Sequence, residues 1–189
     1  MNDPSRLPQG QYATAKWPIL HAGNVPAAPD FASWRFRVFG EVENPLEFTY
    51  DELRALPATE LVCDIHCVTR WSRFDMPWKG VSFRSLVALA KPHASAQHVI
   101  SHAEADYSAN LPLGVMDADD VLIAYEADGE PLTPDHGYPL RLLVPKRYFW
   151  KSSKWLRGLE FSAEDKPGYW ENYGYSNSAD PFKEERYEF

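Results

Sequence analysis

The chain has 189 residues, of which 44% are hydrophobic and 14% aromatic, so it can bury a packed core and is not a disordered chain. Its formal net charge is −8, and such an acidic chain is a poor ligand for polyanions, so nucleic acid is not an expected partner. Two cysteines do not make a disulfide scaffold in a chain of this length.

The first half of the chain combines an irregular arm with short elements. Residues 1–33 are rich in Pro and Ala and are expected to form an irregular N-terminal arm. Residues 35–42 alternate apolar and polar, which predicts a strand. Thr49 and Glu52 have capping-box spacing, which predicts a short helix ending near residue 56. A strand is expected at 60–67, a turn at 78–81, and a helix at 83–90 capped by Ser82.

The second half has mostly strand signals. Strands are expected at 99–102, 121–127, 140–145 and 155–161, with Asp128 and Gly129 forming a turn. The expected organisation is one domain over 34–165, with residues 166–189 as a C-terminal arm packed on it. The fold class is α+β, with strand-rich mixed sheets and short helices.

The chain shows no signal for export or membrane insertion. Its first 20 residues lack a basic segment followed by an apolar one, and no apolar run approaches the roughly 18 residues of a membrane helix. The expectation is a cytoplasmic protein without a membrane segment.

Both cysteines lie in the stretch CDIHCVTRW, residues 63–71. In a regular strand, Cys63 and Cys67 would be about 13 Å apart, too far for a disulfide or for a shared zinc ion. Two buried core thiols are one interpretation. A zinc site made of Cys63, His66 and Cys67 is an alternative if the strand breaks. Cys67, at the strand end and followed by Arg70 and hydroxyl residues, is a candidate thiolate for nucleophilic or metal-binding chemistry.

A basic segment lies at residues 141–157, RLLVPKRYFWKSSKWLR, which has no Asp or Glu. Lysines, serine hydroxyls and turn N–H groups together suit a phosphate. A plain basic surface patch is the alternative. A thiolate in one place and an anion site in another indicate a ligand with a soft metal at one end and a phosphate at the other.

These segments resemble the sulfite oxidase-type molybdopterin-binding oxidoreductases. The likeness is nearest to the small stand-alone members and to the methionine-sulfoxide reductase catalytic subunits. It rests on HCVTRWS with PWKGV, on YSANLPL, on HGYPLRLLVP and on KSSKW, which start at residues 66, 77, 107, 136 and 151. The resemblance implies the sulfite oxidase-type fold and molybdenum bound to molybdopterin, with no haem in this chain.

The resemblance also assigns roles to residues. Cys67 matches the metal-ligating cysteine. Near that metal, Arg70 is a candidate for attracting an oxyanion, with a structural salt bridge as the alternative. Asp106 and Tyr107 are candidates for lining the pocket, with a packed core tyrosine as the alternative for Tyr107. The residues at cofactor-contacting positions are His21, Asn24, Val25, His102, His136, Arg141, Lys151, Ser152, Ser153 and Lys154.

The expected function is two-electron oxygen-atom transfer to or from a small oxyanion or a sulfoxide-like substrate. Electrons would be exchanged with a separate partner. A non-catalytic module that binds a pterin or another anion is the alternative from a different class of protein.

Overall fold

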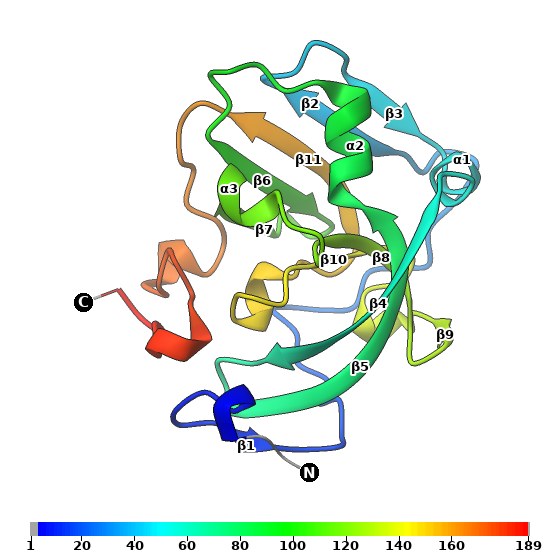
Figure 1. The fold of residues 1–189 in the computed structure, drawn as a ribbon. Coiled ribbons are helices and arrows are strands. Elements are labelled where there is room, and N and C mark those ends of the chain that lie inside the picture. The colour runs from blue at the N-terminus through cyan, green and yellow to red at the C-terminus, as the bar shows by residue number, and fades with distance from the viewer. Residues whose placement is uncertain (1–3, 189) are drawn as a thin grey trace.

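The computed structural model describes residues 4–188, so Met1–Asp3 and Phe189, at the tips of the two expected arms, lie outside the described residues. The fold is built on two mixed sheets with few and short helices (Figure 1), which confirms the expected α+β class. No helix in the described part of the chain is long and apolar enough to cross a membrane.

The first sheet holds six strands in the order β1-β5-β8-β10, with β4 paired to β5 and β9 paired to β8. Its longest strand, β5, curves from the start of α2 down to β1 (Figure 1). The bounds of its strands are β1 Tyr12–Ala13, β4 Ala58–His66, β5 Trp71–Ser82, β8 Leu122–Ala127, β9 Glu130–Pro131 and β10 Arg141–Leu143.

The second sheet holds five strands in the order β3-β2-β11-β6-β7, of which only β2 and β11 run parallel. The strands are β2 Phe36–Gly40, β3 Leu46–Phe48, β6 His98–Ala103, β7 Ser108–Pro112 and β11 Leu156–Ser162. The helices are α1 Tyr50–Arg54, α2 Phe83–Ala90 and α3 Leu113–Met116, with 3-10 turns at Pro4–Arg6, Pro134–His136, Phe149–Lys151, Glu171–Tyr173 and Pro181–Lys183.

Local signals account for several of these boundaries. Thr49 and Glu52 form the expected capping box at the start of α1. Helix α2 spans the expected residues, although the Ser82 side chain makes no capping hydrogen bond. Asp128 and Gly129, both with positive φ, form the tight turn between β8 and β9.

The turn expected at 78–81 is wrong, because these residues lie inside β5. Strand β5 pairs there with β4 on one side and β8 on the other. Gly80 permits this close approach, since a Cβ on it would lie 2.3 Å from the carbonyl oxygen of Ile123. The glycine that suggested a turn therefore serves strand packing instead.

Two apolar clusters hold the fold together. The larger one fills the space between the sheets and α2, with residues such as Phe36, Phe83 and Phe161 completely buried. The second cluster packs Cys67 and Trp71 against Ile65, Met76 and other side chains of the first sheet. Cys67 is therefore packed against apolar side chains, which limits how far its own side chain can move.

Candidate functional site

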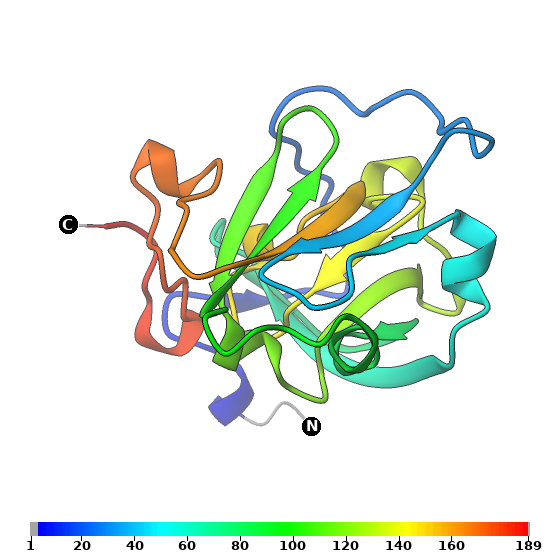
Figure 2. The ribbon, with the colours of Figure 1, turned by 90° about the horizontal axis from the view of Figure 1, so that it is seen from above.

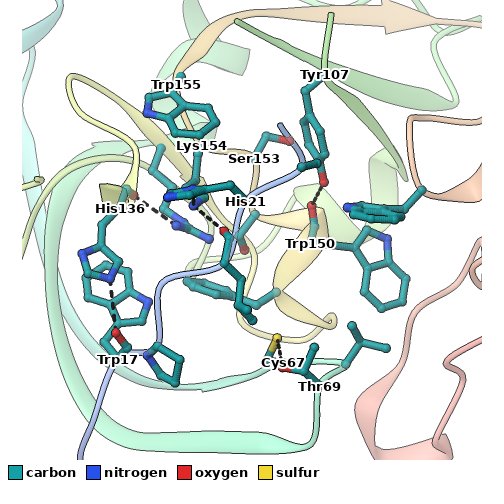
Figure 3. A pocket seen from close by; sticks show the side chains of 18 of the residues that line it. Trp17, His21, Cys67, Thr69, Tyr107, His136, Trp150, Ser153, Lys154 and Trp155 are labelled. Carbon is teal, nitrogen blue, oxygen red and sulfur yellow. Dashed lines mark hydrogen bonds between the residues drawn. The ribbon is translucent and has the colours of Figure 1, made fainter. Parts of the chain in front are cut away.

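A cavity of about 290 Å³ opens above the second cluster. Cys67 and Thr69 lie at one end of it, and His21, Lys154 and Trp155 lie at the other (Figure 3). Tyr107 and Trp150 line one side, whereas Trp17 and His136 line the opposite side. The remaining lining residues are Pro18, Leu20, Ala22, Val68, Trp71, Arg141, Phe149, Ser152, Ser153, Trp170 and Tyr175.

Cys67 is the thiol of this cavity. It immediately follows β4, is 8% exposed and forms no disulfide. Burial raises the pKa of its thiol, while hydrogen bonds from Thr69 and the charges of Arg141 and Arg186 oppose that rise. The Thr69 hydroxyl donates to Cys67 Sγ at 3.1 Å. The sulfur is thus held in place, faces the cavity and has cations nearby, as a metal-binding thiolate requires.

Arg141, at the start of β10, is a buried cation without an acidic partner. It is 4% exposed and forms no ion pair with any carboxylate in the described part of the chain. Burial lowers its pKa to about 9. One Nη donates to the carbonyl of His136 at 3.1 Å, and the guanidinium lies 3.9 Å from the centre of the Phe149 ring. Its Nε is buried and has no hydrogen-bond partner among the described residues. This donor is therefore free to meet an anionic ligand.

Lys154 is the second cation of the cavity. Burial and the charge of Arg141 lower its pKa to about 7. Its Nζ contacts the Leu20 carbonyl at 2.6 Å, the Asp135 carbonyl at 2.9 Å and His21 Nδ1 at 2.7 Å. It therefore fixes part of the N-terminal arm against the loop before β10.

Two histidines and two serines complete this end of the cavity. His136 stacks on Trp17 with ring centroids 3.8 Å apart, and burial lowers its pKa. His21 Nε2 lies 3.2 Å from an Asp135 oxygen. Ser153 Oγ is 2.7 Å from Ser101 Oγ, and Ser152 Oγ accepts a hydrogen bond from the Val144 N–H at 2.9 Å.

These residues fit a ligand with an anionic tail and a soft metal. Arg141, a desolvated cation that no carboxylate among the described residues pairs with, would cost stability unless a negative charge compensated it. The cavity also offers a thiol at its other end and aromatic walls between the two ends, which suit a planar ring system.

The pKa values predict how anion affinity depends on pH. Sulfate is a suitable probe because it does not titrate near neutral pH. The protonated Lys154 ammonium attracts sulfate, and the neutral amine does not. Sulfate affinity for the cofactor-free protein is therefore expected to fall as pH rises through the Lys154 pKa of about 7. The fall between pH 6 and pH 8 is expected to be roughly tenfold. Titration calorimetry checks this, and Lys154→Met should remove the pH dependence; an equally steep dependence in that variant would contradict it.

Eight of the sequence-predicted site residues line the cavity, and six do not. The eight are Cys67, Tyr107, His21, His136, Arg141, Ser152, Ser153 and Lys154. Arg70 and Asp106 are exposed and lie in tight turns with positive φ, outside the lining. Neither side chain is among the residues that line the cavity. Asn24 and Val25 also lie just beyond it, since the lining of the arm ends at Ala22.

His102 and Lys151 have other partners. His102 Nε2 lies 2.9 Å from Glu160 on the neighbouring strand β11. Lys151 is fully buried and pairs with Glu171 at 2.6 Å. Its Nζ also donates to the carbonyl and side-chain oxygens of Asn110 at 2.8 and 3.0 Å. The two lysines of the basic segment thus point in different directions: Lys154 lines the cavity, whereas Lys151 contacts Glu171 of the C-terminal segment.

Sequence reasoning missed the aromatic walls. Seven aromatic lining residues were not predicted as site residues: Trp17, Trp71, Phe149, Trp150, Trp155, Trp170 and Tyr175. The interleaving of aromatic residues and cations in 141–157 was the available signal for three of them. Trp17, Trp170 and Tyr175 come from the two ends of the chain, and no local pattern marks them.

The zinc alternative is wrong for the described part of the chain. No group of three or more His, Cys, Asp or Glu side chains there could hold a metal ion. Cys63 is a free thiol packed against the second cluster, and burial raises its pKa to about 12. His66 is buried, hydrogen-bonds to Ser72 Oγ at 2.8 Å and has its pKa lowered to about 4 by burial.

A family model for the oxidoreductase molybdopterin binding domain matches residues 22–170. The chain belongs to this family. It is therefore a molybdopterin-dependent oxidoreductase, with molybdenum and molybdopterin as its cofactor, as the motifs predicted. The matched region contains the cavity's thiol, Cys67, and its two cations, Arg141 and Lys154.

Individual relatives agree with the family. An uncharacterized oxidoreductase, YuiH of Bacillus subtilis, is 44% identical over 96% of this chain and 92% of its own length. A putative protein-methionine-sulfoxide reductase subunit of Azospira oryzae, YedZ1, is 30% identical over 78% of this chain and 56% of its own. The protein-methionine-sulfoxide reductase catalytic subunit MsrP of Campylobacter jejuni is 29% identical over 75% and 53%.

The fold has a solved counterpart in the sulfane dehydrogenase SoxCD of Paracoccus pantotrophus. The TM-score is 0.66 and the identity 25%, over 74% of this chain and 40% of that one. This chain thus spans about half or less of the MsrP, YedZ1 and SoxCD chains, but nearly all of YuiH.

Proposed function

We propose that Cys67 ligates molybdenum and that this oxidoreductase transfers an oxygen atom in a two-electron reaction. The observation that supports this most is the placement of Cys67. The Cys67 thiol faces one end of a cavity, Lys154 lies at the other end, and the buried Arg141 is also in the lining; both cations suit a phosphate. The cavity therefore offers the two kinds of group that a metal–pterin–phosphate ligand needs, at opposite ends (Figure 3).

When bound, the cofactor supplies the redox chemistry, and the chain supplies binding, orientation and exclusion of water. Cys67 Sγ is the ligand atom, and the Thr69 hydroxyl holds it by donating a hydrogen bond. Arg141, Lys154 and Ser153 bind the anionic tail. The aromatic walls keep water from the metal end.

Tyr107 is a polar group on the cavity wall. Its hydroxyl donates to the Trp150 carbonyl at 2.6 Å, and burial raises its pKa, so it stays protonated. We assign it a role in shaping the wall beside the substrate, with Trp150 held in turn by Glu171 through its indole N–H at 2.8 Å.

The substrate belongs to the small oxyanions or sulfoxide-like compounds, and electrons come from or go to a separate partner. The names of two relatives support this, since MsrP is a methionine-sulfoxide reductase catalytic subunit and YedZ1 a putative subunit of such a reductase. A separate partner is consistent with the word subunit in both names.

Metal and pterin content test the proposal. The native chain, made in molybdate-supplemented cells that assemble the cofactor, should contain near-stoichiometric molybdenum and release a fluorescent oxidised pterin. The loaded protein should then reduce methionine sulfoxide with a reduced viologen, or oxidise sulfite with ferricyanide. Absence of molybdenum and pterin from such cells would contradict the proposal and favour a module that binds another anion.

A further inference from the structure

The loop between β4 and β5, which carries Cys67, is a tight turn. The Cys67 N–H donates to the Trp71 carbonyl at 2.9 Å, and the Arg70 N–H donates to the Cys67 carbonyl at 3.0 Å. Arg70 adopts a φ of 77°, a conformation that costs energy in a residue with a side chain. Such a turn needs contacts from outside to keep one conformation.

Gln11, next to β1, supplies the first of these contacts. Its side-chain N–H₂ donates to the Cys67 carbonyl at 2.9 Å and to the Trp71 carbonyl at 3.1 Å. The amide therefore bridges the two ends of the loop. The backbone of β1 adds to this, because the Tyr12 N–H donates to the Arg70 carbonyl at 2.8 Å.

Arg186, near the C-terminus, supplies the second contact that holds the Cys67 loop. It is only 6% exposed, and its guanidinium donates to the Val68 carbonyl and to Gln11 Oε1, the latter at 3.1 Å. It also lies 4.9 Å from the centre of the Tyr148 ring. Arg186 thus connects the loop, Gln11 and the ring beneath them. The first and last described segments lie on the same side of the molecule in both views (Figures 1 and 2).

Gly10 shows how closely these groups pack. It has a φ of +73°, and a Cβ on it would lie 2.5 Å from Glu184 Oε1 and 3.3 Å from Arg186 Nη2. The positive φ favours glycine at this position, where the N-terminal segment passes the ends of the Glu184, Arg70 and Arg186 side chains.

We propose that Gln11 and Arg186 are positioning residues that hold the Cys67 loop in the geometry its sulfur needs. Both lie outside residues 22–170, the region that the family model matches. The two chain ends therefore hold the loop that carries Cys67, although neither residue lines the cavity itself. The role of these residues in catalysis rests on the proposed ligation of the metal by Cys67. Their hydrogen bonds to the loop do not depend on that proposal.

Thiol reactivity in the full-length, cofactor-free protein tests the inference without any cofactor. Iodoacetamide labelling of Cys67 and Cys63, followed by mass spectrometry, gives a rate for each thiol. Gln11→Leu and Arg186→Lys should each raise the Cys67 rate by roughly tenfold, because losing a buried hydrogen bond shifts a local opening equilibrium by about that factor. The lysine variant keeps the positive charge but loses the fork that reaches two acceptors.

Cys63 is the internal reference, since it is a second largely buried thiol on the adjoining strand β4. A local effect leaves its rate unchanged. Matched controls are Gln97→Leu and Arg84→Lys, which remove comparable polar contacts at exposed sites on other elements. A parallel rise at both cysteines, or no rise at Cys67 beyond the controls, would overturn the inference.

The loaded protein gives a second readout. The visible absorption band of the oxidised, thiolate-ligated centre should shift in Gln11→Leu while molybdenum content stays near that of the native chain. An unshifted band together with unchanged labelling rates would overturn the positioning role. A native chain without molybdenum would contradict only the proposed function, because the labelling result would still stand.

Discussion

Replacing Lys151 with methionine is expected to lower the free energy of unfolding by roughly 3–5 kcal/mol, because it leaves the buried Glu171 carboxylate without its cation. Both side chains are almost completely inaccessible, at 0% and 3% exposure, and their charged atoms are 2.6 Å apart. The Lys151 ammonium also satisfies both oxygens of Asn110. Chemical denaturation of the cofactor-free protein measures the loss.

The matched control is Lys146→Met. Lys146 is 59% exposed and lies 3.5 Å from Asp120, so its loss should change stability by less than about 1 kcal/mol. At a temperature where Lys151→Met remains folded, its sulfate affinity should equal that of the native chain. A large drop in sulfate affinity with little loss of stability would instead return Lys151 to the cofactor-binding residues.

Replacing Arg141 with methionine is expected to abolish anion and cofactor retention, with a loss of roughly 2–5 kcal/mol in sulfate binding, because a buried cation that faces the ligand is removed. Arg141 is buried, has no acidic partner among the described residues, and carries a pKa lowered to about 9. The same change should leave the cofactor-free protein at least as stable as the native chain, since it removes an uncompensated buried charge.

Calorimetry with sulfate and thermal unfolding of the same preparations measure both effects. The control is Arg157→Met, in which a cation of the same basic segment is lost. Arg157 contacts Glu104 and the Arg35 carbonyl and lies outside the cavity. If Arg141→Met unfolded the protein while Arg157→Met did not, Arg141 would be a structural residue and its assignment to the anion would be contradicted.

The sequence was most informative where chemistry is carried by residues close together in the chain. The end of the strand made Cys67 a candidate, and the family resemblance singled it out over two buried core thiols; Arg141 and Lys154 were marked by a segment with many cations and no acid. Charge clustering does not give side-chain direction, however. A 3-10 turn at Phe149–Lys151 sends Lys151 toward Glu171 and away from the cavity.

Long-range packing could not be predicted in the same way. The turn signal at residues 78–81 was overridden by strand pairing on both sides of Gly80. Trp17, Trp170 and Tyr175 reach the cavity from segments with weak periodicity, and Gln11 and Arg186 meet across almost the whole chain. Such contacts are set by how the two chain ends pack on the sheets, which no local pattern records.

Ligation of the metal by Cys67 is the central claim, and X-ray absorption at the molybdenum edge tests it most directly. The native chain and Cys67→Ser, both loaded with cofactor, would be compared for the number of sulfur neighbours around molybdenum. We expect the variant to lose a sulfur neighbour and gain an oxygen neighbour while keeping its pterin. The same sulfur count in both proteins would show that Cys67 does not bind the metal.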